Sequence, residues 1–551
     1  MSAPKVYDVV VLGSGIAGSM LGAILARHGT RVLILDAGVH PKFAIGESTI
    51  PYTLVALRTV AERYDVPEIK TLATFTNCTR VIAPSHGVKK HFGFLIHHEG
   101  QSQDPAETNQ FNTPGLLHEA SHMFRQDTDA YLFHAALKYG CEQRQNAAVV
   151  DVEFDGAGAD VTIANGERFR GRYVVDASGF RSPLAEKYGL RDTPCRFKHH
   201  SRSMWNHMVG VTPTDQLFAH QPRTALPPVP WYQGTVHHMF ERGWFWVIGF
   251  DNHKASRSPL CSVGLTLDPR RYPRDESLSP GAEFEQYAQR FPDIARQYQG
   301  ARPVRDWIST GRLQYSSRQV VGDRWCLLSH AAGFIDPLFS RGLSNTAEAV
   351  NALAWRLLDA VRDDDFSAER FEYIDRLQQS LFDFNDELVN AAFISFSDYQ
   401  LWSAVFRIWA WGSNAGTFRL QEGLTEFMRD GRDSHLRDLE EAAHLGFYWP
   451  DHDGYRGLFD TMVRLCDEVE AGVTSSADAA DRLYVDLVAA DFVPKHFGFS
   501  DRNRRFLNPT PVTLIKTIRW ARQHADPRVR DLMFGVGKDA LLHKLTGRRI
   551  F

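Results

Sequence analysis

Cysteine is scarce and scattered in this chain. Its six cysteines form no C-x-x-C pair and no cysteine–histidine zinc spacing. This pattern excludes a disulfide framework and a zinc module, so we expect no bound metal ion. Reduced, scattered thiols are typical of a cytoplasmic protein, which is the location we predict.

Long apolar runs and an excess of one charge are also missing. No apolar run approaches the length that spans a bilayer, and the first residues lack the charged and apolar regions of a signal peptide. The 62 basic and 66 acidic residues leave a net charge of −4, so we expect no nucleic-acid and no membrane partner. At about 150 residues per domain, 551 residues predict two to four compact units.

The N-terminal region carries a β-α-β pattern. Tyr7–Leu12 is a short apolar run typical of a buried strand, and residues 31–36 form a second. Between them, residues 15–28 have small and apolar side chains at helical spacing. This order predicts two parallel strands joined by a right-handed helical crossover.

The first turn of this unit predicts a dinucleotide site. It reads Gly13-Ser14-Gly15-Ile16-Ala17-Gly18, which fits G-x-G-x-x-G. Gly13 permits the tight turn, Gly15 lets a pyrophosphate approach the backbone, and Gly18 lets the helix pack on the strand. The helix N-terminus offers N–H groups to the phosphates, and Asp36 ends the next strand, where a carboxylate accepts bonds from ribose hydroxyls.

Two later segments favour FAD over NAD. Residues 174–179, Val-Val-Asp-Ala-Ser-Gly, end a strand in small residues and resemble the second dinucleotide contact of large flavoproteins, with Asp176 and Gly179 as its contact residues. Residues 331–337, which end at Asp336-Pro337, then open a helix. In such flavoproteins, the N-terminus of that helix points at the flavin ring.

The rest of the chain indicates an interleaved α/β protein. Residues 51–64 and 127–139 are predicted helices, the second with Asp127 as N-cap. Alternating patterns predict strands over 148–154, 160–163, 168–176, 203–211, 234–250 and 261–267, and the last three, rich in aromatics, suggest a separate sheet. The chain turns mostly helical after residue 342, and the tail from about 413 fits no element clearly.

We therefore predict a Rossmann-type FAD-binding fold like that of glutathione reductase and aromatic hydroxylases. The predicted parts are an FAD-binding domain over 1–190 and 300–365, a substrate-side β-sheet region over 191–299, and a mainly helical C-terminal region over 366–551.

Four segments resemble the flavin-dependent halogenases across nearly the whole chain. They are Gly46-Glu47-Ser48-Thr49, the Gly87–Phe94 segment that holds Lys89, Trp244-Phe245-Trp246-Val247-Ile248, and the Asp336–Gly342 loop. The likeness is closest to members that act on free tetracycline-like phenols and pyrroles. It implies an oxidoreductase that chlorinates a small, electron-rich aromatic, as in antibiotic biosynthesis.

The resemblance also implies the cofactors and the roles of particular residues. FAD would arrive as FADH2 from a separate NAD(P)H-dependent flavin reductase. With O2 it would form a flavin hydroperoxide that oxidises chloride to hypochlorous acid. Backbone amides at Arg341-Gly342 would hold the halide, Lys89 would aim the chlorine, and Trp244 and Trp246 would keep the substrate from the hydroperoxide. Further cofactor contacts would come from Glu47, Ser48, Arg125 and Gly342.

The sequence departs from the family pattern at three places. Gly249 stands where the tryptophan motif ends in proline, which keeps an aromatic hydroxylase open as the alternative. Ser329-His330 replaces the Gly-Asp that many flavoproteins carry on the ribityl side. Phe339 replaces the glutamate of tryptophan-specific members, which makes a phenol the expected substrate.

Two questions stay open at this stage. His97, His98 and Glu47 are the candidates for a general base. A non-catalytic flavin-binding scaffold is a third reading, which Lys89 and the halide-side loop oppose because a scaffold needs neither.

Overall fold

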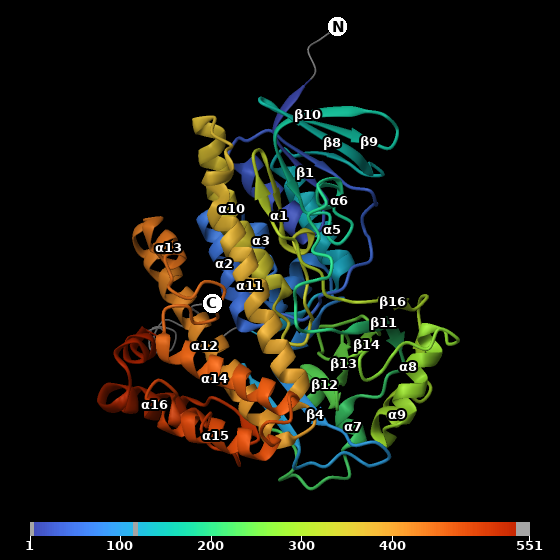
Figure 1. Ribbon diagram of the computed structural model, residues 1–551, viewed down its shortest axis with the longest axis vertical. Helices are drawn as coiled ribbons and strands as arrows, with labels where there is room; N and C mark the ends of the chain where they lie inside the picture. Colours follow the sequence, from blue (N-terminus) through green and yellow to red (C-terminus); the bar gives the residue numbers. More distant parts are fainter. Residues whose placement is uncertain (1–4, 114–118, 536–551) are drawn as a thin grey trace. The chain divides into compact units, whose positions relative to one another are not determined.

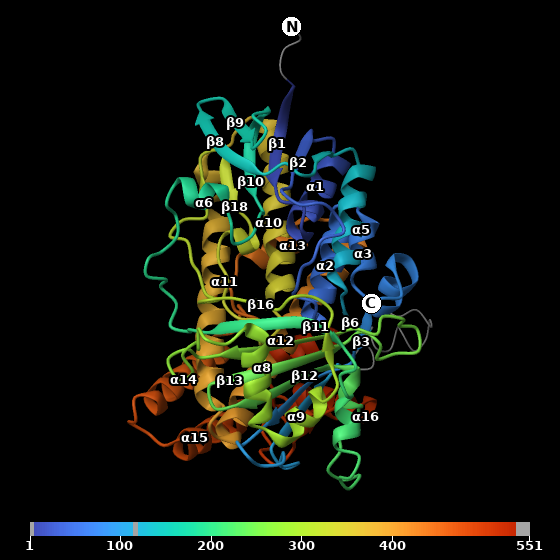
Figure 2. The same ribbon diagram turned by 90° about the vertical axis from the view of Figure 1, so that its right-hand side faces the viewer.

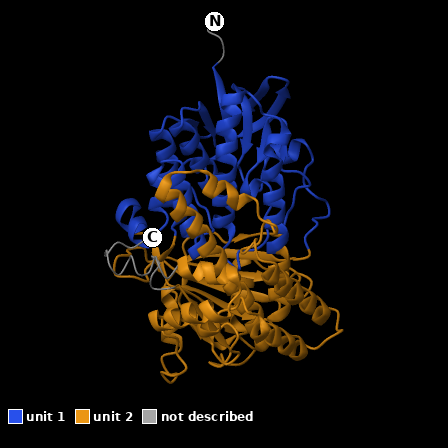
Figure 3. Cartoon of the chain, turned by 90° about the vertical axis from the view of Figure 1, so that its left-hand side faces the viewer, with its two compact units in different colours: residues 1–83, 123–197, 314–385 blue, residues 84–122, 198–313, 386–551 orange. Residues whose placement is uncertain are grey.

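The computed structural model describes residues 5–113 and 119–535. The chain divides into two compact units (Figure 3). Unit 1 comprises residues 1–83, 123–197 and 314–385, and unit 2 comprises residues 84–122, 198–313 and 386–551. The end of the predicted helical region, residues 536–551, lies outside the described residues.

Unit 1 is built on a mostly parallel sheet with the strand order β17-β18-β10-β1-β2-β7. The apolar runs found in the sequence form its centre, and β1 pairs in parallel with both β2 and β10 (Figure 1). The strands are β1 (Val6–Leu12), β2 (Val32–Leu35), β7 (Glu142–Arg144), β8 (Val149–Asp155), β9 (Gly158–Ile163), β10 (Arg168–Asp176), β17 (Val321–Gly322) and β18 (Trp325–Leu327).

Helices complete unit 1. Since α1 connects β1 to the parallel strand β2, the predicted β-α-β unit is confirmed, and with it the Rossmann-type α/β fold. The helices are α1 (Ile16–Arg27), α2 (Pro51–Arg63), α3 (Pro67–Thr71), α4 (Phe75–Asn77), α5 (Arg125–Lys138), α6 (Pro183–Lys187) and α10 (Gly342–Asp363). The long helix α11 (Ala368–Ser395) belongs to unit 1 up to residue 385 and to unit 2 beyond it.

Unit 2 contains a mostly antiparallel sheet with the order β15-β11-β14-β13-β12-β4-β5-β19, and β16 pairs with β11. A separate two-stranded sheet pairs β3 with β6. The strands are β3 (Gly87–Lys89), β4 (His91–Ile96), β5 (Thr108–Asn112), β6 (Ala120–His122), β11 (Arg202–Val209), β12 (Thr235–Phe240), β13 (Gly243–Gly249), β14 (Cys261–Leu267), β15 (Arg302–Pro303), β16 (Ile308–Ser309) and β19 (Phe506–Leu507).

Helices cover both faces of this sheet, which explains why every residue of β4 is buried. Helices α8 and α9 lie on one face (Figure 2), where Phe245 packs against Phe284 of α8 and Phe240 packs against Phe291, the residue before α9. On the other face, Phe92 and Phe94 pack against tryptophans of α12. The helices are α7 (Thr214–Leu217), α8 (Pro280–Gln289), α9 (Pro292–Tyr298), α12 (Tyr399–Asp430), α13 (Ser434–Arg437), α14 (Asp453–Glu470), α15 (Ser476–Ala489) and α16 (Pro511–His524).

Some elements differ from their sequence predictions. The 234–250 run is a hairpin, because Arg242 turns the chain with φ +61° between β12 and β13. Helix α5 begins at Arg125 with Phe124 as N-cap, so the prediction of Asp127 as N-cap was wrong; Asp127 lies in the first turn, where its charge suits the helix dipole. Strands β4 and β5, which fall in the stretch that the prediction placed with the FAD-binding region, pair with β12 and β19 of unit 2 instead.

Candidate functional site

The glycine turn after β1 has the geometry of a dinucleotide cradle. Gly13 has φ +99°, and a Cβ there would lie 2.6 Å from the Ala177 carbonyl oxygen. A Cβ at Gly18 would lie 2.0 Å from the Gly13 carbonyl oxygen, so this glycine allows α1 to approach the turn. A Cβ at Gly15 would meet only open space. The three glycines therefore serve turn, access and packing, in that order.

A cavity of about 1120 Å³ opens at this turn, within unit 1. It is at least as large as the pockets of about 300–1,000 Å³ that hold ordinary small ligands, which fits a dinucleotide. The predicted cofactor residues that line it are Gly13, Gly15, Ala17, Asp36, Arg125 and Gly179, and further lining residues include Leu328, Ser329, His330, Leu343 and Thr346.

Asp36 is held rigidly at the end of β2. Its Oδ2 accepts hydrogen bonds from Ser14 N (2.6 Å) and Ser14 Oγ (2.7 Å) and pairs with Lys42, and its Oδ1 accepts from Gly38 N (2.7 Å). Burial alone would raise the pKa of Asp36, but the Lys42 charge and these hydrogen bonds together bring it below its ordinary value. The carboxyl is therefore ionised and ready to accept donors.

Arg125 ties the Gly46-Glu47-Ser48 loop to α5. Its guanidinium bonds both oxygens of Asp129, at 2.8 and 3.0 Å, and its Nη1 donates to the carbonyl oxygens of Ile45 (2.5 Å) and Gly46 (3.2 Å). The Glu47 carbonyl accepts from Met123 N at 2.7 Å. Glu47 and Ser48 are buried and do not line the cavity, so their position supports the loop that borders it.

Asp176 has a structural place rather than a cavity position. It is fully buried and accepts hydrogen bonds from Ser178, Ser182 and the Leu184 N–H, which fixes the start of α6. Burial raises its pKa. Its neighbour Gly179, with φ +84°, lines the cavity instead.

The Asp336–Gly342 loop ends at the N-terminus of α10. Ser340 adopts φ +53°, a strained value for a residue with a side chain, and its hydroxyl donates to Ser48 Oγ at 3.0 Å. Arg341 is the N-cap of α10, makes no side-chain cap, and lies with its guanidinium 4.6 Å from the Phe384 ring centre. The first turn of this 22-residue helix thus presents backbone donors suited to an anion.

The residues next to this helix start include His330. A Cβ at Gly342 would lie 3.4 Å from His330 Nε2, and Phe334 packs edge-on against the imidazole at 5.1 Å. The imidazole lines the cavity and is surrounded by protein on its other sides. This burial lowers the pKa of His330 to about 4. A neutral imidazole therefore faces the cavity. Asp336, whose Oδ1 accepts from Leu338 N at 3.0 Å, shapes the loop and does not line the cavity.

Lys89 lies in unit 2, on β3, and its side chain is almost completely buried. Its Nζ lies 3.3 Å from the centre of the Phe92 ring. Burial lowers the pKa of Lys89 well below its ordinary value. A lysine amine held over an aromatic ring with a lowered pKa has the properties of a nucleophile rather than of a solvated surface charge.

Trp244 and Trp246 belong to an aromatic layer on the large sheet of unit 2, which is separate from the two-stranded sheet that carries Lys89. Trp244 lies 5.6 Å from Trp246 and 5.3 Å from His237, whose ring stacks on Phe94 at 4.5 Å and on Phe92 at 6.0 Å. Phe92, the ring under Lys89, therefore belongs to the same layer as both tryptophans. Trp246 Nε1 donates to Ser262 Oγ at 3.2 Å.

Gly249 occupies the position of the motif proline without loosening the strand. It has no positive φ and pairs with Cys261, and its carbonyl accepts from His122 Nδ1 at 3.0 Å. Burial lowers the pKa of His122 to about 3, so its ring is neutral and its Nε2 accepts from Thr235 Oγ1 at 3.0 Å. These contacts hold the strand end that a proline would otherwise stiffen.

The histidines proposed as general bases have other partners. His97 Nε2 lies 2.9 Å from His238 Nδ1 inside the core, and His98 Nε2 lies 2.7 Å from Glu107 Oε2. Two residues that sequence reasoning missed are Ser14 and Lys42, which contact Asp36. Both lie within a few residues of the motif positions Gly13 and Asp36.

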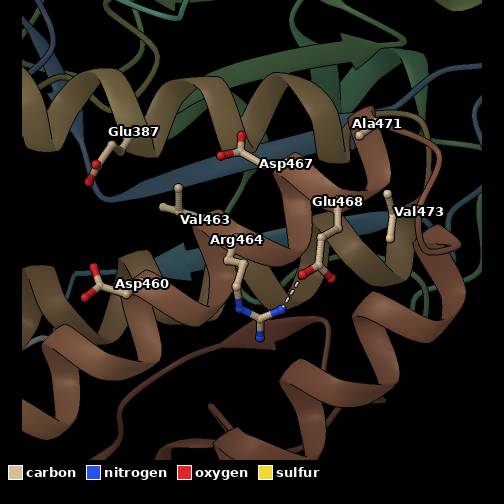
Figure 4. Close-up of a pocket in the computed structure, with 8 residues that line it drawn as sticks. All are labelled: Glu387, Asp460, Val463, Arg464, Asp467, Glu468, Ala471 and Val473. Carbon is tan, nitrogen blue, oxygen red and sulfur yellow. Dashed lines mark hydrogen bonds and ion pairs between the residues drawn. The ribbon is translucent and has the colours of Figure 1, made fainter.

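A second hollow lies elsewhere on unit 2, between α11 and α14 (Figure 4). It has a volume of about 440 Å³, and its charged lining includes Asp460, Asp467 and the Arg464–Glu468 ion pair. None of the predicted site residues lines it. We therefore place the candidate site at the unit 1 cavity and at Lys89, and not here.

Comparisons with known proteins identify the family of this chain. The family model described as tryptophan halogenase matches residues 94–405. Tetracycline 7-halogenase of Kitasatospora aureofaciens is 51% identical over 96% of this chain and 95% of its own length. Monodechloroaminopyrrolnitrin halogenase PrnC of Pseudomonas fluorescens is 46% identical over 95% of this chain and 93% of its own.

A solved structure extends the agreement to the fold. The crystal structure of halogenase PltM in complex with phloroglucinol and FAD has a TM-score of 0.88 and 33% identity, and the match covers 91% of this chain and 100% of that chain. Separately, among residues 5–113 and 119–535 no helix is long and apolar enough to cross a membrane. From these matches, the chain belongs to the tryptophan halogenase family and is a flavin-dependent halogenase, an oxidoreductase.

Proposed function

We propose that this enzyme chlorinates a phenolic, tetracycline-like polyketide or a closely related electron-rich aromatic. The 51% identity to a tetracycline halogenase over nearly the whole chain supports this substrate class. Phe339, which is buried and apolar, supports it as well, because a phenol stabilises the positive charge of its ring through its own oxygen. The observation that carries the proposal is the buried Lys89 amine over Phe92.

The residues of unit 1 fit the cofactor. Gly13, Gly15 and the N-terminus of α1 would hold the pyrophosphate of FAD, and Asp36 would accept its ribose hydroxyls. Bound as FADH2, the cofactor supplies, with O2 and chloride, an oxidised chlorine as hypochlorous acid. The backbone donors at Arg341-Gly342 would hold the chloride.

Lys89 would carry the chlorine to the substrate. Because burial lowers its pKa, its Nζ is available as a neutral amine, which reacts with hypochlorous acid to give an N–Cl bond and water. The aromatic carbon then takes the chlorine, and the ring proton leaves as the amine is restored. The aromatic layer of Phe92, Trp244 and Trp246 would exclude water around this amine and bar the substrate from the flavin.

We further propose that a separate NAD(P)H-dependent flavin reductase supplies FADH2, and that the enzyme works in the cytoplasm. Six cysteine thiols, five of them buried, fit a reducing compartment.

The test is an assay with FADH2, chloride, O2 and a phenolic polyketide. We expect a product with the isotope pattern of chlorine. A product that gains only oxygen, and that forms equally without chloride, would establish the hydroxylase alternative instead.

A pair of variants tests the lysine. We expect Lys89→Ala to abolish chlorination while flavin oxidation continues, because only the delivery of chlorine is lost. Lys90→Ala is the matched control, since Lys90 is partly exposed and pairs with Glu119 at 3.3 Å. Chlorination by the Lys89 variant at the rate of the control would remove Lys89 from the mechanism.

A further inference from the structure

The strand that carries Lys89 is too small to be rigid by itself. β3 has three residues, and among the strands that the structure describes it pairs only with the three-residue strand β6, through Gly87–His122, Val88–Ser121 and Lys89–Ala120. Isolated two-stranded sheets are marginally stable. A lysine that must place a chlorine on one carbon needs a firmer support.

A loop after the tryptophan strand supplies that support. Asn252, Ser256 and Arg257 of the 250–257 loop bond to residues 84, 86 and 88. Pro84 and His86 lie just before β3, and Val88, the middle residue of β3, turns its N–H and C=O toward the loop at one edge of the strand. Arg257 N donates to the Pro84 carbonyl at 2.6 Å, and Ser256 Oγ donates to the His86 carbonyl at 2.7 Å. β6 occupies the other edge.

Asn252 makes the contact nearest to Lys89. Its Oδ1 accepts from Val88 N at 2.7 Å, and its Nδ2 donates to the Val88 carbonyl at 2.8 Å, so the amide replaces a neighbouring strand at this residue. The second Nδ2 proton goes to the Tyr232 carbonyl at 2.9 Å. Asn252 is fully buried and uses both of its donors.

The approach of the two segments is close. A Cβ at Gly87 would lie 2.2 Å from the Gly249 carbonyl oxygen and 3.0 Å from Asn252 Oδ1. The same Gly249 carbonyl accepts from His122 of β6. The end of the tryptophan strand therefore contacts both strands of the small sheet.

We propose that the 250–257 loop is a clamp that aims Lys89, and that Asn252 is its main positioning residue. This inference rests on the proposed role of Lys89. Asn252 acts through the Val88 backbone and touches neither substrate nor cofactor. Without the Asn252 side chain, the Lys89 amine would no longer be held in one position. Hypochlorous acid would then diffuse into solution instead of chlorinating the substrate.

The experiment measures how much of the hypochlorous acid chlorinates the substrate and how much escapes into solution. Each variant receives FADH2, chloride, O2 and the phenolic substrate, and we compare chlorinated substrate with hypochlorite captured by a diffusible scavenger, monochlorodimedone. We expect Asn252→Ala to lower chlorinated substrate per flavin oxidised by about ten- to hundred-fold, with the scavenger product rising in its place. Flavin oxidation and FAD affinity are expected to stay at the wild-type level.

Asn206→Ala is the matched control. Asn206 lies on β11, is equally buried, and donates one hydrogen bond to a backbone carbonyl, that of Arg305 at 2.8 Å. Ser256→Ala removes one bond of the clamp and is expected to give a smaller loss, which decides the question if Asn252→Ala does not fold. The clamp would be overturned by a folded Asn252 or Ser256 variant that gives the same ratio of chlorinated substrate to chlorinated scavenger as Asn206→Ala. Full chlorination by Lys89→Ala in the same series would instead overturn the role of the lysine.

Discussion

Three glycines of one motif do different physical work at the residue scale. Gly18 faces backbone, since its added Cβ would lie 2.0 Å from the Gly13 carbonyl oxygen, whereas Gly15 faces the open cavity. A side chain at Gly18 therefore collides with the protein itself, and a side chain at Gly15 collides only with whatever enters the cavity.

The alanine variants of these two glycines separate folding from binding. We expect Gly18→Ala to lower the free energy of unfolding by about 1–3 kcal/mol, because neither the helix nor the turn can yield freely. We expect Gly15→Ala to unfold at the wild-type temperature but to bind FAD about ten-fold more weakly, because the pyrophosphate approaches the backbone at this position. Thermal unfolding of the apoprotein and an FAD fluorescence titration measure the two effects. Equal FAD affinity in Gly15→Ala and wild type would contradict the cradle.

Residue-scale reasoning from the sequence finds candidate residues that belong to a local motif, and their roles toward the cofactor stay predictions. The glycine turn, Asp36 and Gly179 lie within short segments, and each was found at the cavity. Asp176, the last residue of β10, is buried and bonds Ser178, Ser182 and the Leu184 N–H, whereas Gly179 lies in the loop beyond the strand and lines the cavity. Asn252 could not be found, since its partner Val88 is 164 residues away in the chain.

At the scale of elements, the fit of Trp246 depends on the neighbouring strand. Gly264 of β14 lies opposite Trp246, and an added Cβ at Gly264 would lie 2.1 Å from the indole ring. In this cross-strand pair, the Trp246 indole packs directly over the backbone of Gly264. The distance between the ring and the sheet therefore depends on the absence of a side chain at Gly264.

This pairing predicts the effect of a single methyl group. We expect Gly264→Ala to displace the Trp246 ring and to lower the free energy of unfolding by about 1–3 kcal/mol. Trp246→Phe in the same chain is expected to restore part of the loss, because the smaller ring leaves room. Gly311→Ala is the control, as its added Cβ would meet nothing within 4 Å. Denaturant unfolding of the single and double variants measures the coupling, and strictly additive losses would count against it.

The limits of prediction at this scale have physical causes. The 234–250 run was predicted as one strand because its turn contains Arg242 rather than glycine or asparagine, and the positive φ of Arg242 leaves no trace in the pattern. The start of the polar tail, residues 413–430, was not recognised as the second half of α12, because polar residues such as Asn414 and Thr417 are buried there and bond carbonyls of their own helix. Tertiary packing overrides local pattern in both cases.

At the scale of the whole molecule, the chain passes repeatedly between the two units. Each unit is assembled from three separate segments, so neither corresponds to a continuous piece of sequence. Sequence reasoning predicted this interleaving from strands that return after long insertions. The position of residues 84–122 was out of its reach, because the parallel pairing of β4 with β12 joins segments more than 140 residues apart.

Neutral histidines in the core of unit 2 give the whole molecule a pH-dependent stability. Burial lowers the pKa of His91 to about 4, and the pKa values of His122 and His237 to about 3, from an ordinary value near 6.5. Between about pH 6.5 and 4 the unfolded chain therefore binds protons at these side chains that the folded chain does not. Protonation favours the unfolded chain, so stability falls as the pH falls through this range.

We expect the free energy of unfolding to decrease by up to about 1.4 kcal/mol per pH unit for each of these histidines as the pH is lowered from 6.5 to 4.5. Denaturant unfolding at pH 7, 6, 5 and 4.5 measures the slope. His237→Phe, which keeps a ring between Phe94 and Trp244, is expected to reduce the slope by the share of one histidine. Carboxylates with lowered pKa values, such as Asp155 at about 2, act only at lower pH, so they do not produce this slope. A stability that stays constant between pH 7 and 5 would show that these histidines are not held neutral in the folded protein.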